Sequence, residues 1–177
     1  MARELIREAG TEHFTLGRLA DRAGVTKPVV YDHFGDKAGA LAELYREFEV
    51  RQRDTLAAAL EGVAPELPAV ARLVADAYVD CCLAEGRELA DVVAALAGSP
   101  TLSQLRQEGE DAYLALCRRA LEPFAGPLDA AGLRAIIGAG DALVRDALAD
   151  RISPADARNT LTRVITAIAT TDRRETE

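Results

Sequence analysis

The sequence predicts an all-α protein, and three observations support this. Alanine accounts for 35 of the 177 residues, and together with leucine, arginine and glutamate it forms helices readily. No stretch shows the sustained alternation of apolar and polar residues that marks a half-buried strand. Glycine, proline and capping residues divide the chain into segments whose apolar residues recur at helical spacing.

The composition is that of a globular chain, with 49% hydrophobic and 28% charged residues and a formal net charge of −8. A chain this acidic is a poor general binder of polyanions, so any nucleic-acid site must be local and placed by shape. The three cysteines form no even disulfide framework and no CxxC pair, which favours reduced thiols in a cytosolic protein. No apolar run reaches the ~18 residues that a membrane span needs.

Helices are expected, in chain order, over residues 2–9, 16–23, 27–34, 37–60, 68–84, 87–97, 101–122, 129–149 and 154–170. Thr15, Thr26 and Asp36 are placed as N-caps of the second, third and fourth helices. Gly24 is expected to end the second helix in the left-handed conformation. Pro123 should end the seventh helix, and the polar tail from Thr171 should fray.

Glycine and two prolines between Gly62 and Pro68 indicate a boundary between two modules. We expect an N-terminal three-helix domain over residues 1–56 and a C-terminal helical domain over residues 57–177. The four side chains that are lysine or histidine all lie within the first 37 residues.

Residues 15–37 read TLGRLADRAGVTKPVVYDHFGDK and predict a helix-turn-helix. Two short helices flank the turn 24–26, where glycine supplies the positive φ that such a turn needs. Val25 is expected to fill the angle between the helices, and Val30 and Phe34 to face the core. The exposed start of the second helix suits entry into a DNA major groove, and Lys37 suits a phosphate oxygen at a helix N-terminus.

This segment resembles the DNA-binding domain of the TetR family of bacterial transcriptional regulators over roughly residues 2–56. The matching residues are Thr15, Leu19, Ala20, Ala23, Gly24, Val25, Tyr31, His33, Phe34, Lys37 and Leu41. The resemblance implies a homodimer on a pseudo-palindromic operator, released by a small-molecule effector. By position, it implies base contacts from Lys27, Pro28 and Val29, phosphate contacts from Tyr31, His33 and Lys37, and backbone or flanking-base contacts from Thr15, Gly17 and Arg18.

The second domain is expected to hold the effector and to form the dimer through its last two helices. The residues expected to line a mainly aliphatic pocket are Tyr78, Cys82, Val92, Leu96, Tyr113, Leu116 and Cys117. Such a lining favours an apolar or amphipathic ligand, and simple core packing is the alternative for each residue. Asp141 lies on the apolar stripe of its helix and could pair with a cationic ligand group or with Arg145.

The expected function is therefore that of a ligand-responsive transcriptional repressor. The alternative is a small-molecule binding or sequestering protein with a degenerate DNA-binding head, which the acidic total and Asp32 on the recognition helix keep open. An enzyme is not expected, because the chain has no G-x-S-x-G, H-E-x-x-H or P-loop pattern. No catalytic residue, metal site or cofactor is expected.

Overall fold

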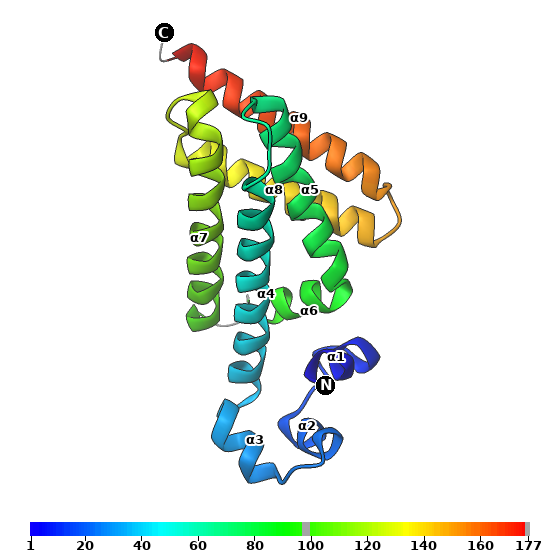
Figure 1. The fold of residues 1–177 in the computed structure, drawn as a ribbon. Coiled ribbons are helices and arrows are strands. Elements are labelled where there is room, and N and C mark those ends of the chain that lie inside the picture. The colour runs from blue at the N-terminus through cyan, green and yellow to red at the C-terminus, as the bar shows by residue number, and fades with distance from the viewer. Residues whose placement is uncertain (97–99, 176–177) are drawn as a thin grey trace. The chain divides into compact units, whose positions relative to one another are not determined.

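The all-α prediction is confirmed by the computed structural model, which describes residues 1–96 and 100–175. Every element within these ranges is a helix (Figure 1). The helices are α1 (Ala2–Ala9), α2 (Leu16–Ala23), α3 (Lys27–Phe34), α4 (Lys37–Leu60), α5 (Leu67–Glu85), α6 (Arg87–Leu96), α7 (Pro100–Ala125), α8 (Ala130–Leu148) and α9 (Pro154–Glu175). None of these helices is both long and apolar enough to cross a membrane.

Two helix ends differ from the prediction by more than one residue. Helix α7 continues through Pro123 to Ala125, because a proline so close to the end removes only one backbone hydrogen bond. Helix α9 continues past Thr170 to Glu175, and the hydroxyls of Thr170 and Thr171 donate to backbone carbonyls of the preceding turn. The predicted end of the sixth helix at residue 97 lies outside the described residues.

The caps of the N-terminal helices lie at the predicted positions, and two of the three form a side-chain hydrogen bond. The Thr15 hydroxyl accepts from the Arg18 backbone N–H at 3.2 Å, and Asp36 Oδ1 accepts from the Gly39 N–H at 2.8 Å. Gly24 ends α2 at φ 67° and ψ 27°, the left-handed conformation expected of it. Thr26 is the N-cap of α3, with extended backbone as predicted, although its side chain makes no capping hydrogen bond.

The chain divides into two compact units. Unit 1 comprises Met1–Glu49 and Glu85–Gly109, and unit 2 comprises Val50–Ala84 and Glu110–Glu177. In unit 1 the buried apolar side chains come mainly from α1 to α4, from the α1–α2 connection and from α6, and they include Leu5, Ile6, Phe14, Leu19, Val30, Leu41, Phe48, Val92 and Leu96. Helices α1 and α6 pack against each other, and two ion pairs, Arg3–Glu85 and Arg7–Glu88, tie α1 to the segment around the start of α6.

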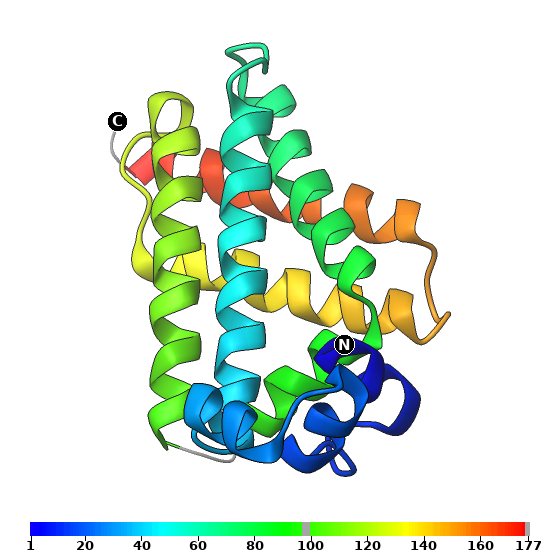
Figure 2. The same ribbon diagram turned by 60° about the horizontal axis from the view of Figure 1, so that its bottom comes forward.

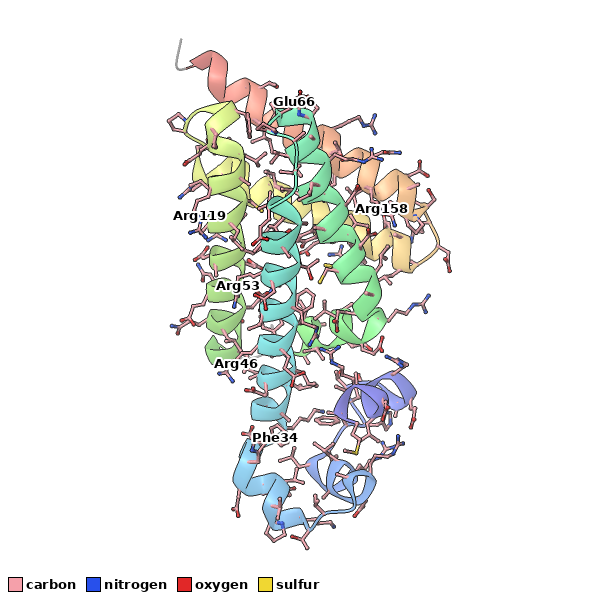
Figure 3. The ribbon with its side chains drawn as sticks, viewed as in Figure 1. Phe34, Arg46, Arg53, Glu66, Arg119 and Arg158 are labelled. Atoms are coloured by element: carbon pink, nitrogen blue, oxygen red, sulfur yellow. The ribbon has the colours of Figure 1, made fainter. Side chains whose placement is uncertain are left out.

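Unit 2 is built around α8 and α9, which pack along each other (Figure 2). The close approach of these two helices uses Gly132, because a Cβ atom there would lie 2.9 Å from Ile168 Cγ2. Helix α5 joins α9 through an ion pair of 2.7 Å between Arg158, labelled in Figure 3, and Asp80. The buried side chains of this unit include Leu56, Val74, Tyr78, Tyr113, Cys117, Leu121, Leu133, Ile136, Leu161 and Ile165.

Candidate functional site

The helix-turn-helix forms as the sequence predicts, with one exception. Helices α2 and α3 pack on each other, and the Val25 N–H donates to the Ala20 carbonyl at 3.1 Å to close the turn. Ala20 and Val30 are buried. Val25, however, is 43% exposed, so the expectation that it fills the angle between the helices is wrong. The buried side chains come from the helices themselves, and the turn residue stays in solvent.

Most of α3 is exposed, as is required of a helix that contacts base edges in a DNA groove. Only Val30 is buried, and Phe34, at the junction with α4 in Figure 3, is half-buried. At about 100° of rotation per residue, Pro28, Val29 and Asp32 lie on the side of the helix away from these two residues. Tyr31 and His33 fall on opposite flanks of that outward face. If α3 entered a major groove, the Tyr31 ring would therefore face one of the two DNA strands that border the groove and the His33 ring the other.

The cations of the helix-turn-helix segment divide into paired arginines and unpaired lysines. The arginines of residues 1–46 all have protein partners: Arg3 with Glu85, Arg7 with Glu88, Arg18 with the carbonyl of His13, Arg22 with Glu8, and Arg46 with Glu43. The Arg22 guanidinium also holds the pKa of Glu8 below its ordinary value. Within the part of the chain that the structure describes, Lys27 and Lys37 make no hydrogen bond or ion pair. Their charges remain available to an external anion.

Lys27 lies near other predicted contact residues, and Lys37 lies beside an open hollow. The aliphatic part of the Lys27 side chain packs against Gly17: a Cβ atom added at Gly17 would lie 3.6 Å from Lys27 Cε. Lys27 is thus placed beside the N-terminal turn of α2, where Thr15 and Arg18 also lie. Lys37 lines an open hollow of about 610 Å³ formed with the α1–α2 connection and α6. A phosphate oxygen could reach its ammonium from solvent.

Gly39 positions the start of α4, a role that the sequence pattern does not predict. A Cβ atom on Gly39 would lie 2.0 Å from the backbone oxygen of Phe34, so only glycine allows the first turn of α4 to sit this close to the end of α3. This contact fixes the position of Lys37, the first residue of α4, relative to the end of α3. The only signal in the sequence is a glycine three residues after the Asp36 cap, which by itself does not reveal a close backbone approach.

The predicted ligand residues are divided between the two units. Tyr78, Cys82, Tyr113, Leu116, Cys117 and Asp141 belong to unit 2, whereas Val92 and Leu96 are buried in unit 1. In unit 2 the Tyr78 hydroxyl donates to Asp141 Oδ1 at 2.6 Å, a partner that the sequence does not predict. The rings of Tyr78 and Tyr113 meet edge to face with centroids 5.6 Å apart.

The environment of these tyrosines is dry. A Cβ atom on Gly140 would lie 2.5 Å from Tyr78 Cε1, so the ring rests directly on α8. Burial raises the pKa of both Tyr78 and Tyr113 well above the ordinary tyrosine value, and the neighbouring Cys82 and Cys117 thiols act in the same direction. Both phenols therefore stay protonated at neutral pH and can only donate or share a proton, not supply a negative charge.

Burial also raises the pKa of Cys117 to about 12, which gives a prediction for stability. The unfolded thiol has an ordinary value near 9, so its contribution to stability is complete below pH 9 and is lost as the pH rises from 9 to 12. The free energy of unfolding of the wild type should then fall faster with pH than that of Cys117→Ala, by about 1.4 kcal/mol per pH unit. Urea titrations between pH 8 and pH 11 measure the difference.

The control for this prediction is Cys81→Ala, because Cys81 is less buried than Cys117. This variant should follow the wild-type pH dependence. Equal slopes for the wild type and Cys117→Ala would contradict the buried, protonated thiol.

Comparison with known proteins addresses the N-terminal segment directly. Residues 1–44 match the family model described as bacterial regulatory proteins, tetR family. No curated protein matches the chain. The matched residues contain α1 to α3 and the start of α4, which is where the unpaired lysines and the exposed recognition helix lie.

Solved structures with the same fold include three regulators. The fatty acid degradation regulator FadR from Bacillus halodurans has a TM-score of 0.78 at 21% identity, covering 93% of this chain and 90% of that one. A putative TetR-family regulator from Rhodococcus sp. has a TM-score of 0.78 at 17% identity, covering 95% and 94%. PfmR from Thermus thermophilus, a TetR-family regulator, has a TM-score of 0.61 at 22% identity, covering 95% and 94%. The match to the tetR regulatory family thus covers the helix-turn-helix segment, and the chain shares its fold with these three structures.

Proposed function

We propose that this protein is a transcriptional regulator of the TetR family, a ligand-responsive repressor that binds a pseudo-palindromic operator as a homodimer and is released by a small-molecule effector. The observation that supports operator binding is the division of charge in unit 1. Arg3, Arg7, Arg22 and Arg46 are paired with carboxylates, and Arg18 donates to a backbone carbonyl, which leaves its charge unneutralised. Among the described residues, Lys27 and Lys37 flank the exposed α3 without a hydrogen-bond or ion-pair partner. Their charges and that of Arg18 are therefore available to DNA, where phosphate contacts fix a protein on the duplex.

The proposed DNA contacts follow from this arrangement. Lys27, Pro28 and Val29 at the start of α3 face base edges, and Tyr31, His33 and Lys37 hold phosphates. Thr15, Gly17 and Arg18 at the start of α2 meet the backbone or a flanking base, with the free N–H groups of that helix end favouring an anion. The acidic net charge confines binding to this surface.

The proposed dimer uses the outward faces of α8 and α9. Leu133, Ile136, Leu161 and Ile165 are buried within unit 2 and cannot also contact a second copy. The side of α8 turned away from that core carries small residues, including Ala135, Gly138 and Ala142, all exposed. Two copies related by a two-fold axis could bring these helices close together. Their recognition helices would then have to lie roughly 34–36 Å apart, one turn of DNA.

The proposed effector is apolar or amphipathic and acts on the C-terminal domain, residues 57–177. The unit 2 members of the predicted set, Tyr78, Cys82, Tyr113, Leu116, Cys117 and Asp141, are the proposed contacts, since their surroundings are aliphatic with two protonated phenols. The role of Val92 and Leu96 stays a prediction. An effector shifts the protein away from DNA only by as much as it prefers the non-binding state.

Selection from a random duplex library by the full chain tests operator binding. We expect enrichment of a two-fold symmetric sequence whose half-site centres are separated by about one helical turn. Enrichment of no sequence would exclude the repressor and favour the sequestering protein with a degenerate head.

Replacing Lys37 with alanine should weaken binding to every duplex, specific or not, about tenfold or more at ~0.1 M salt. The reason is the loss of one phosphate contact from each protomer, so the slope of log K against log salt should fall by about two for the dimer. Fluorescence anisotropy between 50 and 200 mM salt measures both quantities. Arg46→Ala is the matched control, because its charge is already paired with Glu43 at 3.1 Å. An unchanged salt slope for Lys37→Ala would place its ammonium away from DNA.

A further inference from the structure

The exposed apolar side chains of this protein are concentrated in the turn and the following helix of the helix-turn-helix, where they do not contribute to its core. Among residues 1–96 and 100–175, the large apolar side chains that are exposed are Met1, Val25, Val29, Tyr31 and Val50. Three of these five lie between residues 25 and 31. Val29 is the most exposed of the three, at 56%, and Val30 beside it already supplies the core contact of the helix. The core therefore does not account for Val29.

Helix α3 lacks the polar side chains that most often hydrogen-bond to bases in the major groove. Its sequence, KPVVYDHF, contains no arginine, asparagine or glutamine, the side chains that form bidentate contacts with guanine or adenine. Lys27 can bond a guanine, and Asp32 can accept from a cytosine amino group. The remaining outward residues, Pro28 and Val29, have no side-chain hydrogen-bonding group. Whatever they recognise must be apolar.

Only one apolar group projects from base edges in the major groove, the C5-methyl of thymine. Lys37 after α3 can hold a phosphate and Lys27 at its start can bond a base edge, which makes a duplex the occupant whose charge complements the patch. We propose that Val29 is a specificity-determining residue that contacts a thymine methyl in each operator half-site. This inference rests on the proposed operator binding and adds to it the chemistry of the base that is read.

The test removes the methyl group from the DNA and the side chain from the protein, separately and together. The probe is the duplex that the full chain enriches from a random library, and each thymidine of its half-sites is replaced in turn by deoxyuridine, which pairs identically but lacks the methyl. Affinities of the wild type and of Val29→Ala are measured by fluorescence anisotropy at one salt concentration. Val29 is exposed, so the alanine variant should fold, and thermal unfolding followed by circular dichroism checks this.

We expect at least one thymidine at which replacement by deoxyuridine weakens wild-type binding by about fourfold per half-site. This factor is the affinity that burial of one methyl group contributes. At that position Val29→Ala should bind the thymidine duplex at least about fourfold more weakly per half-site, and should no longer respond to deoxyuridine. The control is Val50→Ala, which truncates another exposed valine, 46% accessible, in α4. It should keep the wild-type response at every position.

Two results would overturn the inference while leaving operator binding intact: wild-type affinity that no deoxyuridine changes, or a Val29→Ala variant that keeps the full wild-type sensitivity. An enriched operator without thymine in its half-sites would overturn it in the same way. Failure to enrich any sequence would instead contradict the proposed function itself, and the inference with it.

Discussion

Ala142→Glu should convert the proposed dimer into monomers and lower operator affinity by more than about 100-fold, because two half-sites would no longer be bound together. Ala142 is exposed on the side of α8 away from the unit 2 core, so glutamate there leaves the protomer intact. In a two-fold interface the new carboxylates would face their symmetry mates and would lose their water. Sedimentation velocity and anisotropy titrations on the selected operator measure the two effects.

The matched control for this variant is Ala115→Glu, which makes the same change at an exposed position of α7. It should remain dimeric with wild-type affinity. A dimeric Ala142→Glu variant that binds the operator normally would show that α8 does not form the interface.

Gly39→Ala should lower the free energy of unfolding by about 3 kcal/mol, the upper range for a forced clash in a packed region. The added Cβ would lie 2.0 Å from the backbone oxygen of Phe34, and a backbone atom cannot move aside as a flexible side chain can. The turn between α3 and α4 must then open, which also misplaces Lys37 and should reduce DNA affinity. Urea denaturation and anisotropy measure the two consequences.

Gly62→Ala serves as the control for this effect, since a Cβ at Gly62 meets no atom within 4 Å. A glycine-to-alanine change at an unstrained position is expected to leave stability unchanged or to raise it by up to about 1 kcal/mol. If Gly39→Ala unfolded at the same urea concentration as the wild type, the close approach of α4 to α3 would be wrong.

The sequence by itself determined the helices and most of their boundaries, because these depend on local chemistry. Thr15 and Asp36 cap helices through bonds to backbone three residues away, and Gly24 ends α2 with a conformation that L-residues avoid. The helix-turn-helix was recognisable for the same reason, since its spacing lies within 23 consecutive residues. The family model that matches residues 1–44 agrees with that recognition.

Only the tertiary structure decided which side chains are free. Spacing within the motif predicted a buried Val25, but α2 and α3 close without it and leave it in solvent. The pairing of Arg3 with Glu85 joins residues 82 positions apart, and the Tyr78–Asp141 hydrogen bond joins residues 63 apart. Such partners are chosen by how helices pack, and local sequence carries no record of that packing. The unpaired state of Lys27 and Lys37, on which the proposed DNA contact depends, became visible only once the arginines were seen to be occupied.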